Sequence, residues 1–461
     1  MKTKKEKNPY ILTLKESRAI LRSNLAEMKK YEKAKRKKVT PDYFTTELKD
    51  ESNILEVENL HTYFYTDSGV SKAVNGVTFS VPKNSIVGLV GESGCGKSVT
   101  SLSIMQLVQA PQGQVVDGSI RFATHDFVLD EKGKKIPIYV TDDNGEVVYV
   151  DKLDKKGNPV IDKQTGETVR IPLQATSEDG VPLYEMEAKT YDIVKMPTDD
   201  MYRIRGKDIS MIFQEPMTSL NPVFTVGHQI EEVVYLINPT ATKEQARAKA
   251  IEMLTRVGIP MPETIVNYYP HQLSGGMRQR VMIAIALVGN PKLIIADEPT
   301  TALDVTIQSQ ILRLIKDVQQ QCGASVVLIT HDLGVVAETC DYVVVMYAGK
   351  IVEKGTVYEI FDKPLHPYTK GIQKAKPTME TGLNSELYSI PGVVPNPINI
   401  PNECLFKGRC GERCSKCEGE YPEEIKITET HSVFCHKYRD IQVEQPAKKS
   451  TKTTTKKQTK K

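Results

Sequence analysis

Residues Gly91 to Ser98 form a glycine-rich loop that constrains the fold of this chain more than any other segment. The loop reads Gly-Glu-Ser-Gly-Cys-Gly-Lys-Ser, between the apolar run Ile86 to Val90 and the helix-like segment Val99 to Val108. In a G-x-x-x-x-G-K-[ST] loop between a strand and a helix, the glycines let backbone N–H groups close around an anion. The sequence therefore predicts an α/β fold that binds a nucleoside triphosphate.

The loop also predicts roles for single side chains. Lys97 would reach the β- and γ-phosphates, and the Ser98 hydroxyl would hold Mg²⁺, because the charge of the triphosphate must be neutralised before water attacks. We expect the other nucleotide contacts from Gly91, Ser93, Gly94, Cys95, Gly96 and Val99.

Two adjacent carboxylates follow the apolar strand predicted over Leu293 to Ala296. Asp297 ends that strand, so its carboxylate would lie at the sheet edge beside the phosphate loop, where an outer-shell contact to Mg²⁺ is expected. Glu298 comes next, points to the other side and is a candidate for polarising the attacking water. A solvated acidic pair after a strand is the alternative.

A second anion site is predicted at Leu273-Ser274-Gly275-Gly276-Met277, directly before a helix expected from Arg278 to Val288. The Ser274 hydroxyl and free N–H groups would stand at the positive end of that helix. One triphosphate cannot fill both sites of one chain if they lie apart. We therefore expect two chains to sandwich ATP.

Taken in their order along the chain, these motifs resemble those of an ABC-transporter nucleotide-binding domain, which is an ABC-type P-loop NTPase with a helical subdomain. The resemblance covers Leu55 to about Gly355, apart from an insertion. It is carried by Gly91 to Ser98, Gln214, Leu273 to Met277, Leu293 to Glu298, Ala302-Leu303-Asp304 and His331.

The resemblance implies further roles. Gln214 would contact Mg²⁺ or water and couple to a membrane subunit, whereas Ser274 and Gly276 would bind the γ-phosphate held by the opposite subunit. Asp304 would lie across the dimer interface. His331 would act at the γ-phosphate, although a lone histidine after a strand is otherwise a packed core residue.

An aromatic side chain that stacks on adenine is also implied. Phe64 is the best match, but Tyr63 and Tyr65 flank it and leave the register open.

Longer motifs are similar to those of the oligopeptide/dipeptide/nickel importer subfamily. They are Met217 to Pro222, Arg256 to Pro260, Tyr269 to Arg280 and His366 to Thr369. The forms Gly-Gly-Met and Val-Gly-Ile-Pro look like its D-type ATPase subunit, which pairs with a related F-type subunit. The resemblance also implies two transmembrane permease subunits and, indirectly, an extracellular substrate-binding protein.

On this basis we expect a peripheral ATPase at the cytoplasmic face of the membrane that energises oligopeptide import, with no nucleic-acid partner. No stretch approaches the ~18 apolar residues of a membrane span. The ATPase of a dipeptide or nickel importer, and a soluble ABC ATPase outside transport, are the alternatives.

Five of the eight cysteines lie in a short C-terminal segment. Cys404, Cys410, Cys417 and Cys435 resemble the cysteine pattern of the subfamily, which binds a [4Fe–4S] cluster in some members. Cys414 is extra to that pattern. Zinc is the competing metal, and a metal-free segment is the third possibility.

Composition predicts the domain organisation. Residues 1–38 contain 14 Lys/Arg and 4 Asp/Glu, and the tail from Lys448 contains 7 Lys and no acid, so both ends are basic and the middle is acidic. Apolar residues recur at helical spacing from Leu12 to Tyr31, which predicts an amphipathic helix against a partner or a membrane surface. The tail is expected to be a solvated, disordered extension, with anionic lipid or nucleic acid as the alternative partners.

Between residues 124 and 197, Asp- and Gly-rich turns separate short strand-like runs, which predicts a β-meander insertion. The predicted parts are a partly helical N-terminal extension (1–50), the ABC ATPase domain (51–123 and 198–360), the insertion (124–197), a C-terminal regulatory and cysteine module (361–440) and the Lys-rich tail (441–461).

Overall fold

The computed structural model describes residues 13–35, 37–154, 157–162, 165–176, 182–301, 303–375 and 388–439. The Lys-rich tail over 441–461 and Ala302 therefore lie outside the described residues. The same holds for the first twelve residues of the predicted N-terminal extension.

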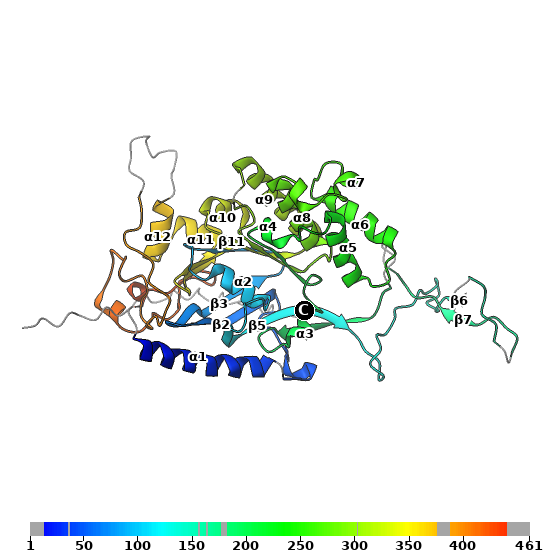
Figure 1. The fold of residues 1–461 in the computed structure, drawn as a ribbon, viewed down its shortest axis with the longest axis horizontal. Helices are drawn as coiled ribbons and strands as arrows, with labels where there is room; N and C mark the ends of the chain where they lie inside the picture. The colour runs from blue at the N-terminus through cyan, green and yellow to red at the C-terminus, as the bar shows by residue number, and fades with distance from the viewer. Residues whose placement is uncertain are drawn as a thin grey trace, which may run out of the picture.

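A mixed eight-stranded sheet occupies the centre of the molecule, in the order β14-β15-β13-β12-β4-β11-β10-β9 (Figure 1). Strands β12, β4, β11, β10 and β9 run parallel. β4, β10 and β11 are buried along their whole length, as expected for parallel strands covered on both faces. The strands are β4 (Ile86–Val90), β9 (Ile209–Ile212), β10 (Leu293–Asp297), β11 (Ser325–Thr330), β12 (Tyr342–Tyr347), β13 (Lys350–Thr356), β14 (Ile425–Lys426) and β15 (Ser432–Val433).

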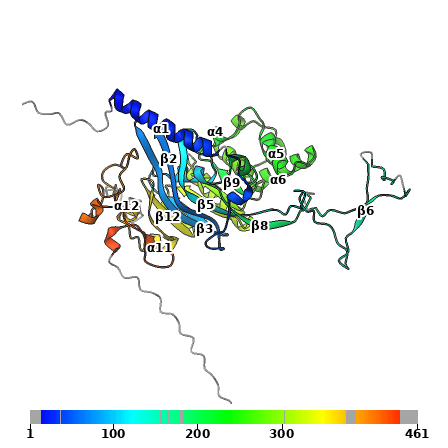
Figure 2. The same cartoon turned by 90° about the horizontal axis from the view of Figure 1, so that it is seen from below.

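A second, antiparallel sheet has the order β1-β8-β5-β2-β3. Its strands are β1 (Thr45–Thr46), β2 (Asn53–Thr66), β3 (Gly69–Pro82), β5 (Gly113–Phe127) and β8 (Met186–Asp192). The helix α1 (Leu14–Lys35) contacts β2, β3 and β5 and lies across this sheet (Figure 2). One side of α1 is buried at Asn24 and Met28, and Asn24 Nδ2 donates to the Thr66 carbonyl at 2.8 Å.

Helices of the second half of the chain form a layer of their own at one side of the central sheet (Figure 1). Within it α8 contacts α4, α5 and α6. Besides α1, the helices of the described ranges are α2 (Lys97–Ile104), α3 (Thr198–Met201), α4 (Pro216–Ser219), α5 (Val226–Ile237), α6 (Lys243–Arg256), α7 (Pro262–Ile265), α8 (Gly275–Leu287), α9 (Val305–Cys322), α10 (Leu333–Thr339), α11 (Val357–Asp362) and α12 (Pro367–Lys374), of which α2 and α3 lie outside this layer.

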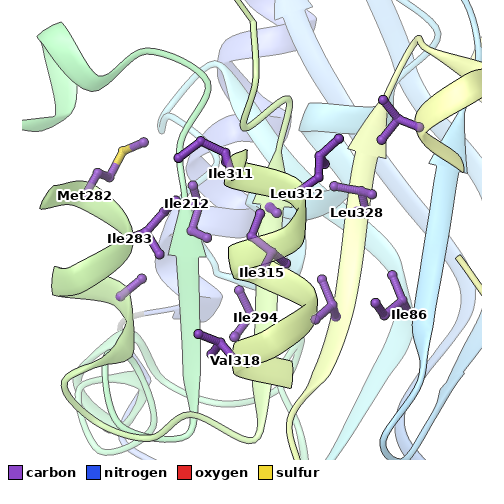
Figure 3. Packing of buried hydrophobic residues seen from close by; sticks show 14 of the residues in the cluster. Ile86, Ile212, Met282, Ile283, Ile294, Ile311, Leu312, Ile315, Val318 and Leu328 are labelled. Atoms are coloured by element: carbon purple, nitrogen blue, oxygen red, sulfur yellow. The ribbon is translucent and has the colours of Figure 1, made fainter. Parts of the chain in front are cut away.

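The largest hydrophobic cluster fills the space between α8, α9 and the central sheet (Figure 3). Buried residues of α9 recur at helical spacing, which turns one face of the helix toward strands β9 to β11. The α9 residues are Ile311, Leu312, Ile315 and Val318. Gly323, with φ +62°, ends the helix in the left-handed conformation.

Between β5 and β8 the chain leaves the antiparallel sheet, projects away from the body and returns (Figure 1). The projecting part contains the short pair β6 (Tyr149–Asp151) and β7 (Arg170–Pro172), with isolated bridges around it. At the first turn, Asp130 accepts the N–H groups of Lys132 and Lys134, and Gly133 has φ +75°. β8 and the end of β5 fall inside the range 124–197 but belong to the antiparallel sheet, because their pairing continues from Arg121 to Phe127.

None of the helices in the described ranges combines the length and the apolar character that a membrane crossing requires.

Candidate nucleotide-binding site

The phosphate loop connects β4 to α2 and depends on two glycines with positive φ. Gly91 has φ +152°, and a Cβ there would lie 2.2 Å from the Met346 carbonyl oxygen. Gly96 has φ +99°, and a Cβ there would lie 2.3 Å from the Ala73 carbonyl oxygen. Neither position accommodates a side chain, because the loop backbone lies directly against these neighbours. Helix α2 begins at Lys97, immediately after Gly96.

Lys97 is buried at the base of this loop. Its ammonium donates to the carbonyls of Gly91 at 2.8 Å and Glu92 at 3.1 Å. The Cys95 thiol is also buried, and burial raises its pKa. Ser93 and Gly94 are exposed at the tip, whereas Val99 is half-buried on α2.

Strand β10 brings its terminal carboxylate to the phosphate loop. Ser98 Oγ donates to Asp297 Oδ1 at 2.9 Å, although the two residues are 199 positions apart. Burial is the main reason that the pKa of Asp297 is raised, and the hydrogen bond from Ser98 opposes the shift. A hydroxyl and a carboxylate side by side are the oxygen ligands that Mg²⁺ takes beside nucleotide phosphates. The donor set therefore fits the predicted metal.

Two sheet-edge residues converge on Glu298. Gln214, after β9, donates to Glu298 Oε2 at 3.0 Å, and His331 Nδ1, after β11, lies 3.4 Å from Oε1. Glu298 itself has φ +44°, a conformation that is uncommon for a residue with a side chain. The glutamate side chain is 12% exposed and the histidine side chain 61%, so the group opens to solvent on one side.

Thr301 is a contact of this group that the sequence analysis did not single out. Its hydroxyl donates to Glu298 Oε2 at 2.9 Å. A hydroxyl three residues after the carboxylate, within the same turn, was the available signal.

Phe64 lies on the side of β2 that faces α2. Thr62, two residues earlier, shares a hydrogen bond at 2.8 Å with Ser103 of α2. Side chains two positions apart on a strand point to the same face. A Cβ on Gly113, the cross-strand partner of Phe64, would lie 2.8 Å from Phe64 Cε1.

Tyr63 points to the opposite face, toward α1. Its cross-strand partner Gln114 donates to Glu32 of α1 at 2.8 Å. The strand alternation therefore favours Phe64 over Tyr63 as the residue beside the phosphate loop, and its contact with adenine stays a prediction.

The predicted second anion site lies at two neighbouring helix N-termini. Ser274 caps α8 by accepting the Met277 N–H at 3.3 Å, and Asp304 caps α9 by accepting the Ile307 N–H at 2.9 Å. Gly276 faces Ile307 of α9, and a Cβ added to Gly276 would lie 3.1 Å from the Ile307 side chain. Gly275 is exposed. Among the described residues no hydrogen bond or ion pair joins these caps to the phosphate loop of the same chain.

The C-terminal cysteines lie near one another. Cys414 Sγ and Cys417 Sγ are 3.5 Å apart. Burial raises the pKa of Cys404 to about 12 and also raises those of Cys410 and Cys435. Within the described ranges, no three His, Cys, Asp or Glu side chains are placed to hold one metal ion. A [4Fe–4S] cluster or zinc at these cysteines therefore stays a prediction.

Comparisons with known proteins agree with the geometry of the phosphate loop and sheet edge. Residues 74–148 and 182–301 match the family model described as ABC transporter. Residues 352–417 match the model described as oligopeptide/dipeptide transporter, C-terminal region.

Curated relatives align with most of the chain. The oligopeptide transport ATP-binding protein AppD of Bacillus subtilis is 43% identical over 86% of this chain and 99% of its own length. The oligopeptide transport ATP-binding protein OppD of the same organism is 43% identical over 83% of this chain and 88% of its own length. The dipeptide transport ATP-binding protein DppD of B. subtilis is 41% identical over 83% of this chain and 94% of its own length.

The phosphate loop, the carboxylates at the end of β10 and the two matching family models lead to one assignment. This chain belongs to the ATPase cassettes of the ABC transporter family, in the branch that carries the oligopeptide/dipeptide transporter C-terminal region.

Proposed function

We propose that this chain is the ATP-hydrolysing subunit that energises the import of oligopeptides through an ABC transporter. The observation that carries the proposal is the convergence of Gln214, His331 and Thr301 on Glu298, beside the Ser98–Asp297 pair. The similarity to named oligopeptide transport ATP-binding proteins supports the cargo class. A dipeptide cargo is the second candidate, because the dipeptide transport protein is nearly as similar.

The side chains would divide the reaction between them. Lys97 would exchange the loop carbonyls for the β- and γ-phosphates, and Ser98 with Asp297 would hold Mg²⁺, which when bound supplies neutralising charge. Glu298 would accept the proton of the attacking water, because its carboxylate follows Asp297 at the sheet edge and is held in place by Gln214 and Thr301. Gln214 and His331 would orient that water.

The complete site needs a second cassette. Ser274, Gly276 and Asp304 stand at helix N-termini that are suited to an anion, and they have no link to their own phosphate loop among the described residues. We propose that they face the phosphate loop of a homologous F-type ATPase subunit. Two transmembrane permease subunits would receive the motion through the Gln214 region, and an extracellular binding protein would deliver cargo to them. The chain would sit peripherally on the cytoplasmic face.

The test is a Glu298→Gln variant of the full chain, mixed with its partner cassette and saturated with ATP. We expect ATP hydrolysis to be lost, ATP binding to be kept and a stable two-chain complex to form in size-exclusion chromatography with light scattering. Failure to form that complex would contradict the sandwich.

Capture of the wild-type chain from detergent-solubilised membranes tests the partners. Permease subunits with a second cassette are the expected result, whereas ribosomes or DNA would contradict a role in transport. The metal prediction for Cys404, Cys410, Cys417 and Cys435 has no part in this mechanism. The colour and metal content of anaerobically purified protein test it.

A further inference from the structure

Glu92, the second residue of the phosphate loop, is held by a residue from the far end of the chain. Arg409 Nη1 lies 2.7 Å from Glu92 Oε2, and Nη2 lies 3.0 Å from Oε1. The Arg409 side chain is 8% exposed and that of Glu92 is 30% exposed. Such a two-pronged, partly buried pair has more defined geometry than an exposed ion pair.

Arg409 is itself fixed in place. Its Nε donates to the Pro391 carbonyl at 3.0 Å, and Nη2 donates to the Ile390 carbonyl at 3.2 Å. The guanidinium lies 5.8 Å from the centroid of the Tyr347 ring. The position of the charge is therefore set by the C-terminal segment rather than by Glu92 alone.

Tyr368 holds the backbone of the same residue. Its hydroxyl accepts the Glu92 N–H at 2.8 Å. The Tyr368 ring is fully buried and packs against Tyr347, with centroids 4.7 Å apart, and against Phe406, with centroids 5.5 Å apart. The third polar group of Glu92, its carbonyl, accepts from Lys97. Every polar group of Glu92 is thus engaged, and one of its partners is the predicted phosphate-binding lysine.

Charge gives this contact a functional consequence. An uncompensated carboxylate within a loop that receives a triphosphate would repel the ligand over a few ångströms, where Coulomb energies are large if water is partly excluded. Arg409 neutralises this carboxylate, and Tyr368 fixes the N–H beside it.

We propose that Arg409 and Tyr368 are positioning residues for the phosphate loop, so that the C-terminal segment sets the nucleotide affinity of the cassette through Glu92. The proposal rests on the proposed function in one respect, namely that the loop over residues 91–98 binds ATP.

The experiment measures the dissociation constant of a fluorescent ATP analogue for the purified full chain. We expect Arg409→Gln to weaken binding by about tenfold, because it leaves the Glu92 charge unpaired. The double variant Glu92→Gln/Arg409→Gln should recover much of this loss, since the repelling charge is gone. Tyr368→Phe, which keeps the ring, should weaken binding by roughly threefold, in line with the loss of one neutral hydrogen bond.

Arg413→Gln is the matched control, because Arg413 lies in the same segment and pairs with the exposed Glu418. It should leave the dissociation constant unchanged. Melting temperatures of all variants separate a loss of affinity from a loss of folding.

The variant Lys97→Ala distinguishes a failure of the proposed function from a failure of the positioning role. If Lys97→Ala does not change binding, the proposed function fails. If Lys97→Ala abolishes binding but Arg409→Gln, folded like the wild type, binds as tightly as the wild type, only the positioning role is overturned. A double variant as weak as Arg409→Gln would also overturn it, because the loss would then not arise from the unpaired carboxylate.

Discussion

Protonation of His366 is expected to destabilise the protein at mildly acid pH. The imidazole is 2% exposed, and its Nδ1 accepts the Tyr368 N–H at 3.1 Å, which requires the neutral ring. Burial lowers the pKa of His366 from 6.5 to about 4, even though nearby Glu353 and Glu412 act in the opposite direction and Lys370 adds to the shift.

The sign of the effect follows from the depressed pKa. Below pH 6.5 the unfolded chain binds a proton at this histidine that the folded chain does not bind until pH is near 4. The stabilisation is therefore complete above pH 6.5 and is lost as pH falls toward 4. A shift of this size corresponds to about 3 kcal/mol in total, of which about 2 kcal/mol is lost between pH 7 and pH 5.

The assay is urea unfolding of the full chain at pH 7, 6 and 5, for the wild type and for His366→Asn. Asparagine keeps a side-chain acceptor at the N-cap of α12 but does not titrate. Between pH 7 and pH 5 the free energy of unfolding of the wild type should fall by about 2 kcal/mol more than that of the variant. Parallel pH profiles would refute the reasoning. Titrating groups that do not interact with His366 contribute equally to both proteins and cancel in the difference.

Three further outcomes are expected. Phe64→Ala should weaken nucleotide binding about tenfold, as the loss of a base-stacking aromatic does, whereas Tyr63→Ala on the opposite face should not. A larger loss of affinity for Tyr63→Ala than for Phe64→Ala would contradict the strand alternation. Ile311→Ala should lower the free energy of unfolding by about 3 kcal/mol, against no measurable loss for Leu14→Ala, which is 79% exposed; equal effects in urea unfolding would be inconsistent with the packing around α9. Iodoacetamide at pH 8 should label Cys414 well before Cys404, because Cys414 is exposed and a hydrogen bond from Cys417 lowers its pKa, whereas burial raises the pKa of Cys404. Mass spectrometry that finds Cys404 labelled first would contradict this prediction.

Some elements of the fold could be predicted with their observed bounds. The runs Ile86 to Val90 and Ser325 to Thr330 each predict a buried strand, and their bounds coincide with those of β4 and β11. The run Ile54-Leu55-Glu56-Val57 predicts only a short strand, whereas β2 extends to Thr66, because pairing resumes beyond register shifts that a simple alternation does not contain. Helix α5 was not predicted, although Thr225 caps it.

In the nucleotide-binding site, too, some contacts could be predicted from the sequence and others could not. The meeting of Ser98 and Asp297 follows from local pattern, since the carboxyl ends of parallel strands lie at one edge of a sheet. The contact between Arg409 and Glu92 joins residues 317 positions apart. No local periodicity or motif spacing encodes such a contact, because it depends on how the C-terminal segment packs against Tyr347 and Tyr368.

The projecting segment between β5 and β8 departs from, and comes back to, strands that are hydrogen-bonded neighbours. Its two ends therefore meet where Phe127 pairs with Met186. A short turn that joins Phe127 to Met186 would connect the two strands without moving either. The segment could therefore be shortened, exchanged or removed while the ATPase domain keeps its fold. A role of this segment would then be separable from nucleotide binding, because its connection to the ATPase domain lies at this one pair of strand ends.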